Sequence, residues 1–424
     1  MRVSIPRLEA SPRDGARQRL TARVTYDDRK GPPEDYWLDL PPETGADAAA
    51  SGNPWLVALL PLAATLGGSL EIEAPVDTEL LGNVREVLRI WRRWYPHVRP
   101  VELRCEIAEP ATLEPEVARR AIEPTAGGVG RDRAPGTAAL FSGGVDSFFT
   151  LLRPRHGLHP TRAVAIDHFV TIHGFDIPLD RDEAFSRLSA RVCRIAAETG
   201  CVPLRVATNL RETRWSEADW GRLGHGCALA AVCHALDGVV GTVLVPSGAA
   251  YEDAGPWASH PITDPLLSSS RLRVIHDGAS ADRVEKLELL AGSPMALREL
   301  RVCFRSETDE NCGVCPKCVR TMLTLELLGA SGWSAPFGGI SEVPVHEARR
   351  LYCRWPWDFV YTSHIMELAR ARGRPDVERA LRAAMNGSRR RNRALERMAP
   401  LRETRALAWA PRLAERALLP GWVR

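Results

Sequence analysis

The feature that most constrains this chain is a short apolar segment, then two glycines, then a second apolar segment. Residues 137–141 read as a buried strand, Gly143 and Gly144 as a turn, and residues 146–152 as a helix. Such a turn leaves consecutive backbone N–H groups at a helix N-terminus, where the helix dipole favours an anion. Glycine also removes the Cβ atoms that would block a close approach. The sequence therefore predicts a phosphate-binding loop at residues 142–147, with an ordinary strand-to-helix turn as the alternative.

Two better-known phosphate loops do not fit this stretch. The Walker loop requires a lysine that is missing here, and the dinucleotide fingerprint Gly-x-Gly-x-x-Gly is also absent. What remains, Ser-Gly-Gly-x-Asp-Ser after an apolar strand, resembles the pyrophosphate loop of the PP-loop ATP pyrophosphatases. The resemblance implies that ATP binds with its β- and γ-phosphates on the loop while an acceptor oxygen attacks the α-phosphorus. The nucleotide-binding residues that it implies are Ser142, Gly143, Gly144, Val145, Asp146 and Ser147, and among these Asp146 and Ser147 are the candidates for catalysis.

Length, charge and hydropathy narrow the class of protein. A chain of 424 residues favours about three domains of roughly 150 residues each. The net charge of +3 does not by itself indicate nucleic acid binding. No apolar run resembling a signal peptide follows Met1, and the longest apolar run, residues 55–68, contains Pro61 and is too short to span a bilayer. We therefore expect a cytoplasmic protein with no membrane segment.

Residues 1–123 are predicted to form an N-terminal α+β domain. Strands are expected at residues 18–26, 35–40, 70–74 and 101–107, and helices at residues 54–66 and 83–94. No catalytic constellation is evident there, so we expect a role in shaping the substrate site or in forming a homo-oligomer. The glycine-rich residues 124–136 read as a linker.

Residues 137–330 are predicted to form a doubly wound parallel sheet of the PP-loop class. Strands at residues 137–141, 162–167, 202–207 and 241–246 alternate with helices at residues 184–200 and 225–236. In such a sheet, ligands bind at the carboxyl ends of the strands. The loop residues expected there are Asp167 for a ribose hydroxyl, His168 or Phe169 for stacking on the base, and also Thr208, Asn209, Ser247, His225 and Asp264. For any one of them, a structural role in a capped loop is an equal alternative.

Ten cysteines without a signal peptide favour metal or thiol chemistry over disulfides. Four of them, Cys303, Cys312, Cys315 and Cys318, follow the spacing Cys-x8-Cys-x2-Cys-x2-Cys. The Cys-Gly-x-Cys turn is typical of a metal knuckle, and four thiolates leave no open position. This segment, residues 303–318, therefore predicts a structural zinc ion, with an iron–sulfur cluster as the alternative.

The loop and the cysteines together resemble the 7-cyano-7-deazaguanine synthases, over about residues 137–330. The resemblance implies zinc at the four cysteines and assigns Lys286 to the charge of the phosphates or the adenylate; a surface lysine is the alternative. The deazaguanine pocket of that family has no counterpart in residues 251–264, so the acceptor is left open.

Residues 331–424 are predicted to be mostly helical, with one clear element at residues 376–386. From Arg389 to Arg424 there are ten arginines against three glutamates. A solvated helical face is one interpretation, and contact with RNA phosphates or an acidic protein partner is the other.

The main hypothesis is an AMP-forming ligase that uses ATP and Mg²⁺, with Asp146 as an indirect Mg²⁺ partner. A carboxylate or amide oxygen of a small-molecule or protein acceptor is adenylated, and ammonia or another amine then displaces AMP. Sulfur transfer to tRNA or a small acid is the second hypothesis. A non-catalytic nucleotide-binding scaffold is the third.

Overall fold

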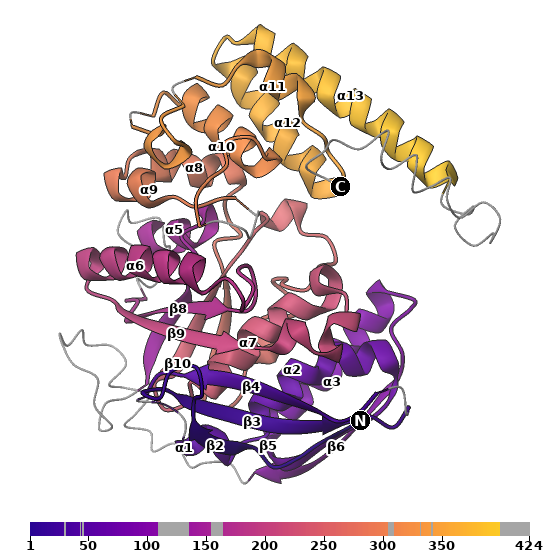
Figure 1. The fold of residues 1–424 in the computed structure, drawn as a ribbon. Helices are drawn as coiled ribbons and strands as arrows, with labels where there is room; N and C mark the ends of the chain where they lie inside the picture. The colour runs from indigo at the N-terminus through magenta and orange to yellow at the C-terminus, as the bar shows by residue number, and fades with distance from the viewer. Residues whose placement is uncertain are drawn as a thin grey trace. The chain divides into compact units, whose positions relative to one another are not determined.

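The computed structural model describes residues 1–28, 31–42, 44, 46–108, 135–153, 164–303, 309–330, 332–340 and 342–398. The chain divides into two compact units, Met1–Ser280 and Ala281–Arg424. Among the described residues, all strands lie in the first unit, and the second unit is helical (Figure 1).

One mixed sheet organises the first unit. Its eleven strands, counted over the described residues, are β1 (Arg2–Val3), β2 (Arg7–Ala10), β3 (Gln18–Thr25), β4 (Glu34–Leu40), β5 (Gly68–Asp77), β6 (Val101–Ala108), β7 (Gly136–Leu140), β8 (His168–His173), β9 (Val202–Thr208), β10 (Val240–Pro246) and β11 (Arg273–Asp277). They lie in the order β11-β10-β7-β8-β9-β4-β3-β1-β5-β6, and β2 pairs with β3. The five strands at one end of this order, β11, β10, β7, β8 and β9, all pair in parallel with their neighbours among the five. Most predicted strands are thus confirmed, with bounds close to those expected.

The predicted N-terminal domain does not stand apart from the parallel strands. Strand β4 pairs antiparallel with β9, with Leu38 opposite Thr208 and Asp39 opposite Ala207. The strands of both expected regions therefore share one sheet in the unit Met1–Ser280, and residues 281–330 of the second region belong to the other unit. The expected linker, residues 124–136, lies outside the described residues except for residues 135 and 136. The expected boundary near residue 330 lies inside the second unit.

Helices of the first unit connect and cover the strands. They are α1 (Ala46–Ala49), α2 (Asn53–Leu66), α3 (Thr78–Trp94), α5 (Val145–Leu152), α6 (Asp182–Thr199) and α7 (His225–Ala235). Helix α2 is apolar on all sides and packs against both β5 and α7, which is the environment such a helix requires. A hydrogen bond from Trp215 Nε1 to the Ala58 carbonyl, 2.6 Å long, adds to this junction.

Local signals set the ends of two of these helices. Asp77 caps α3, since its Oδ1 accepts a 2.9 Å hydrogen bond from Leu80 N–H. Helix α6 ends at Gly200, whose φ of 78° lies in the left-handed region, as the sequence predicted.

The second predicted strand of the parallel sheet is misplaced in the sequence interpretation. The structure places β8 at His168–His173 rather than at residues 162–167. The segment His-Phe-Val-Thr-Ile-His is rich in aromatic and β-branched residues, and Phe169, Val170 and Thr171 are buried in it. Asp167 therefore precedes the strand, and His168 begins it.

The second unit contains α8 (Arg283–Ala291), α9 (Pro294–Glu299), α10 (Pro316–Leu327), α11 (Val345–Arg350), α12 (Pro356–Ala371) and α13 (Pro375–Met398). The predicted helix at residues 376–386 is confirmed as part of α13. Residues 399–424, which carry much of the predicted arginine-rich region, lie outside the described residues. In the described part of the chain, no helix has the length and apolar composition that a membrane crossing demands.

Candidate nucleotide site and metal centre

The predicted phosphate loop connects β7 to α5. Gly143 has a φ of 74°, in the left-handed region that glycine adopts without steric cost. Gly144 precedes the helix with φ −83° and ψ 173°, and no side chain caps the helix. The buried Ser147 hydroxyl donates a 3.0 Å hydrogen bond to the Gly144 carbonyl. Asp146 lies in the first turn of α5 and is half-buried, as is Ser142 in the loop.

Asp277, the last residue of β11, holds α5 in place. Its Oδ2 accepts a 2.7 Å hydrogen bond from Thr150 Oγ1, and its Oδ1 forms an ion pair with the Arg153 guanidinium. All three side chains are buried. The next residue, Gly278, has a φ of 84°, and a Cβ there would lie 3.1 Å from Phe149 Cδ1. The end of β11 therefore positions the helix that begins at the loop.

Sequence reasoning missed β11 and Asp277. The signal that could have revealed them is the short alternating segment 272–276 followed by Asp-Gly, because Asp-Gly commonly ends a strand.

His276 lies beside Asp277 on β11, and its side chain points to the opposite face of the sheet, as alternation along a strand requires. Its Nδ1 is 2.7 Å from Asp264 Oδ2, and its Nε2 is 2.9 Å from Ser247 Oγ. Ser247 directly follows β10, the strand that pairs with β11. A buried serine, histidine and aspartate are thus hydrogen-bonded in series at the carboxyl ends of two neighbouring strands.

Asp264 receives two more hydrogen bonds. Ser259 Oγ donates to Oδ2 at 2.6 Å, and His260 N–H donates to Oδ1 at 3.1 Å. Asp264 is only 1% exposed, so an ionised carboxylate there depends on these donors. With Asp264 as the acceptor, the Nδ1 of His276 carries the proton.

Two further histidines surround this group. Burial lowers the pKa of His225, at the start of α7, while the charge of Asp264 opposes the shift. Burial also lowers the pKa of His260, and His276 acts in the same direction. Both neighbours are therefore held toward the neutral form. His225 and Asp264, which the sequence marked only as loop candidates, are brought together with His276.

Ser142 and Ser247 follow β7 and β10, which are adjacent parallel strands. Both residues therefore lie at the carboxyl edge of the sheet. This edge is the one at which the sequence predicted the site.

Asp167 and His168 are at the other edge of the sheet. Asp167 Oδ2 accepts a 2.8 Å hydrogen bond from Thr137 N–H, at the beginning of β7. His168 pairs with Ala138 and Val202, also near the strand beginnings. The predicted ribose and base contacts of these two residues depended on the misplaced strand and are therefore wrong.

Asn209, also expected in the site, joins the two parts of the sheet. Its Oδ1 accepts a 2.9 Å hydrogen bond from Trp37 N–H, and its Nδ2 donates to the Asp35 carbonyl at 2.9 Å. Thr208 Oγ1 donates to the Trp37 carbonyl at 2.8 Å. Both residues thus have a structural role at the β4–β9 junction.

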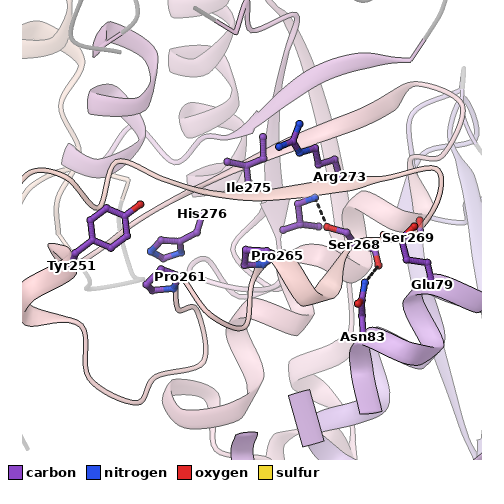
Figure 2. A pocket seen from close by; sticks show the side chains of 11 residues that line it. Glu79, Asn83, Tyr251, Pro261, Pro265, Ser268, Ser269, Arg273, Ile275 and His276 are labelled. Atoms are coloured by element: carbon purple, nitrogen blue, oxygen red, sulfur yellow. Dashed lines mark hydrogen bonds between the residues drawn. The ribbon is translucent and has the colours of Figure 1, made fainter. Parts of the chain in front are cut away.

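A cavity of about 630 Å³ lies beside His276 (Figure 2). His276 and Tyr251 line one end, and Glu79 and Asn83 of α3 line the other, with Arg273 along the wall. Asn83 Nδ2 donates a 3.1 Å hydrogen bond to the Ser268 carbonyl, which holds the loop before β11 against α3.

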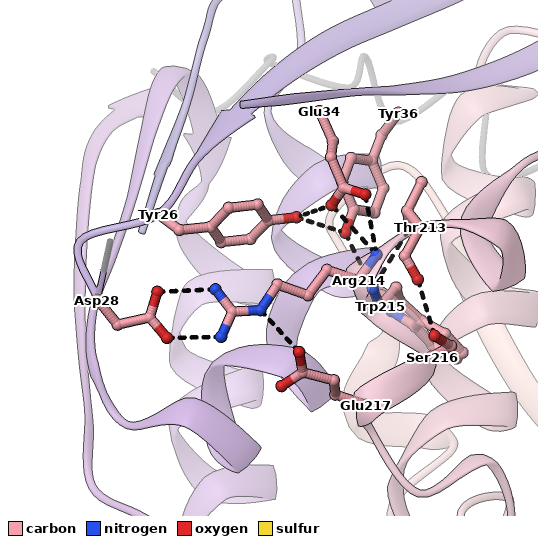
Figure 3. Close-up of polar contacts among 9 residues, drawn as sticks. All are labelled: Tyr26, Asp28, Glu34, Tyr36, Thr213, Arg214, Trp215, Ser216 and Glu217. Carbon is pink, nitrogen blue, oxygen red and sulfur yellow. Dashed lines mark hydrogen bonds and ion pairs between the residues drawn. The ribbon is translucent and has the colours of Figure 1, made fainter. Parts of the chain in front are cut away.

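Arg214 forms a separate polar cluster (Figure 3). Its guanidinium donates two hydrogen bonds to Asp28, at 2.7 and 2.5 Å, and one to Glu217 at 2.9 Å. It also lies 4.7 Å from the centre of the Tyr26 ring. Because the donors face protein acceptors, we interpret the cluster as a brace between the segment after β9 and the end of β3.

The four predicted metal ligands come together in the second unit. The Sγ atoms of Cys303, Cys312, Cys315 and Cys318 all lie within 4.8 Å of one another. The Cys303–Cys315, Cys312–Cys318 and Cys315–Cys318 separations are 3.9, 4.0 and 3.4 Å. Four sulfurs about 2.3 Å from one ion would be about 3.8 Å apart. The cluster therefore has the size that one tetrahedral ion such as zinc requires.

Backbone N–H groups and the Asn311 side chain shape this cluster. Cys315 N–H lies 3.3 Å from Cys312 Sγ, and Gly313 between them has a φ of 69°. Asn311 Oδ1 accepts from Cys303 N–H at 3.1 Å, and its Nδ2 donates to the Leu300 and Pro336 carbonyls. Asn311 thus ties the distant ligand Cys303 to the knuckle. All ten cysteines of the chain are free of disulfides.

Lys286 lies in α8 and is 1% exposed. The alternative of a surface lysine is therefore wrong. Its predicted role toward phosphate stays a prediction.

Comparison of the chain with protein-family models, with curated proteins and with solved structures found no match. The function of the protein is therefore inferred from its own residues and their geometry.

Proposed function

We propose that this protein is an ATP-dependent, AMP-forming ligase with a doubly wound PP-loop domain, similar to the 7-cyano-7-deazaguanine synthases. The observation that carries the proposal is the loop at residues 142–147, where Gly143 has a positive φ and no side chain caps α5. A loop of this shape presents backbone N–H groups and the positive end of a helix dipole to an anion.

The position of the loop in the sheet supports the same function. In chain order the five parallel strands are β7, β8, β9, β10 and β11, and β7 lies between β8 and β10. The direction of strand addition therefore reverses next to β7. In open α/β sheets, ligands bind outside the carboxyl ends of strands at such a reversal.

In this function the protein mainly positions reactants and neutralises charge. The loop backbone, with Ser142 and Ser147, holds the terminal phosphates of ATP, and Asp277 fixes the helix behind it. Asp146 would help to hold Mg²⁺ indirectly, and the ion would supply positive charge to the phosphates. An acceptor carboxylate attacks the α-phosphorus, pyrophosphate leaves, and ammonia or another amine then displaces AMP. The cysteine cluster, with four protein ligands, has a structural role.

The test is pyrophosphate and AMP release from ATP and Mg²⁺. Three acceptor sources are compared: 7-carboxy-7-deazaguanine, a small-molecule fraction and a protein fraction of a cell extract. We expect release with at least one of them. Gly144→Ala should abolish the release of pyrophosphate and AMP, because the new Cβ would obstruct phosphate. Alanine can adopt the φ of −83° that Gly144 has, so the backbone itself does not forbid the substitution. Gly82→Ala, on the open surface of α3, is the matched control.

The outcomes separate the alternatives. A folded chain that binds ATP and forms no AMP with any source is a nucleotide-binding scaffold, and the ligase proposal is then overturned. AMP formed only together with a thiolated product would assign sulfur transfer.

The arginine-rich C-terminal region would suit an acidic protein or RNA partner. In α13, Arg389, Arg390 and Arg391 all lie in the described part of the chain, and all three are exposed. Binding of RNA that weakens steeply with salt would support that partner, since phosphate contacts release counterions. Homo-oligomer formation also stays a prediction, to be measured by sedimentation.

A further inference from the structure

The hydrogen-bonded series Asp264–His276–Ser247 belongs neither to the loop at residues 142–147 nor to the cysteine cluster. Its members come from the loop before β11, from β11 itself and from the end of β10. Ser247 is 1% exposed and the His276 side chain 5% exposed. Such a series, removed from bulk water, is suited to moving a proton.

The contacts of Ser247 satisfy the series in both charge states of the imidazole. When the ring is neutral, Nε2 accepts and the Ser247 hydroxyl donates to it across 2.9 Å. When the ring is charged, Nε2–H donates to Ser247 Oγ, and the hydroxyl donates instead to the Ala249 carbonyl at 2.6 Å. Asp264 accepts from Nδ1 in both states. The three side chains therefore keep their mutual hydrogen bonds in both charge states of the imidazole.

We propose that Ser247, His276 and Asp264 form a proton relay for the amine-transfer half of the reaction, and that ammonia or a small primary amine enters through the cavity beside His276. This inference depends on the proposed ligase function. His276 is the base and lines the cavity, Ser247 transfers the amine proton to it, and Asp264 is a positioning residue.

In the amine-transfer step, the amine nitrogen forms a bond to the acyl carbon of the adenylate. The C–O bond to the AMP phosphate breaks, and its electron pair remains on AMP. A proton passes from the nitrogen to Ser247 Oγ as the Ser247 proton passes to His276 Nε2. The Asp264 carboxylate stabilises the imidazolium as its counter-ion. The imidazolium later releases its proton to water in the cavity.

Several titratable groups surround His276. On its face of the sheet they are Asp264, His260 and His225, and Asp277 points to the other face. Burial lowers the pKa of His225 and of His260 and so favours their neutral form. The carboxylate of Asp264 is therefore the charge that stabilises the His276 imidazolium.

The experiment compares two nucleophiles, ammonium chloride and hydroxylamine, with ATP and 7-carboxy-7-deazaguanine or the acceptor fraction that the pyrophosphate assay selects. Hydroxylamine is largely unprotonated at neutral pH and attacks adenylates without a base. In His276→Gln we expect the ammonia-dependent rate to fall by about 10²- to 10⁴-fold, the usual range for lost acid–base catalysis. Pyrophosphate release and the hydroxylamine-dependent rate should stay within about threefold of the wild type, because neither needs the base.

Ser247→Ala is the milder second variant and should reduce the same ammonia-dependent rate, because it interrupts the path of the proton to His276. His97→Gln, at an exposed position, is the control that should change neither rate. If the wild type is active and His276→Gln and Ser247→Ala leave the ratio of ammonia to hydroxylamine rates unchanged, the relay is overturned. Covalent labelling of Ser247 by a fluorophosphonate would also overturn it, because the serine would then be a nucleophile. If the wild type releases no pyrophosphate, the ligase proposal itself fails, and the relay fails with it.

Discussion

Thr150 Oγ1 lies 2.7 Å from Asp277 Oδ2, and this buried hydrogen bond joins the helix after the first parallel strand to the end of the last one. Arg153 of the same helix pairs with the other oxygen of Asp277. The two contacts fix the helix that carries the predicted phosphate loop. The loop therefore depends on a residue more than one hundred positions further along the chain.

Asp277→Asn should destabilise the first unit strongly. The substitution leaves the Arg153 guanidinium buried without its counter-ion, a change that typically costs about 3–5 kcal/mol. Thr150→Val, which removes only the neutral hydrogen bond, should cost about 1–2 kcal/mol. Urea unfolding measures the loss of stability in both variants. Equal losses in the two variants would contradict the role of the ion pair. Glu102→Gln, in an exposed pair with Arg104, should leave stability unchanged.

The cysteine cluster should bind one metal ion per chain, and we expect zinc. Cys312→Ser should abolish stoichiometric binding and lower the stability of the second unit by at least about 3 kcal/mol, since metal binding contributes directly to folding. Elemental analysis and thermal unfolding with and without a chelator test this. The exposed Cys193, outside the cluster, provides the control Cys193→Ser. Strong visible absorption by the purified protein would indicate iron instead of zinc.

Stability should fall as the pH drops below about 6.5, because several histidines are buried in the neutral form. His234 is 3% exposed, and burial lowers its pKa, while its Nε2 lies 2.8 Å from the Leu267 carbonyl. In the window between this lowered pKa and the ordinary value, the unfolded chain binds a proton that the folded chain does not. Within this window, each such histidine lowers the free energy of unfolding by about 1.4 kcal/mol for each unit that the pH falls.

Replacing His234 by glutamine keeps a donor toward Leu267 and removes the titrating group. The variant should therefore show a shallower loss of stability between pH 7 and pH 5, measured by urea unfolding at each pH. His97→Gln should keep the wild-type slope. A variant at position 234 with the full slope would show that other groups cause the acid sensitivity.

Arg214→Lys should weaken the brace between the segment after β9 and the end of β3. An ammonium cannot donate the paired hydrogen bonds that the guanidinium makes to Asp28. The side chain of Asp28 is 35% exposed, so water compensates in part, and we expect a loss of about 1 kcal/mol. Hydrogen exchange should increase in residues 210–217 and leave α6 unchanged. Uniform exchange across both segments would argue against a local brace.

Short-range features of the chain could be predicted well. The Gly143–Gly144 turn, the helix end at Gly200 and the cysteine knuckle all depend on residues close in sequence, so their geometry follows from local torsions and spacing. Strands such as β3 and β10 have patterns strong enough to be placed nearly correctly. The same reasoning failed at β8, because the segment before His168 is almost as compatible with a strand when its pairing partners are unknown.

What the sequence alone determined is therefore the loop between β7 and α5, the four cysteines of the candidate metal centre and most of the strands. The tertiary structure decided the rest: that β4 pairs with β9, that Asp277 anchors α5, and that Asp264, His276 and Ser247 meet in series. These contacts join residues that are distant in sequence, and they form only once strand order and register are fixed. Pairing of that kind is a property of the whole sheet, and no local pattern of residue types specifies it.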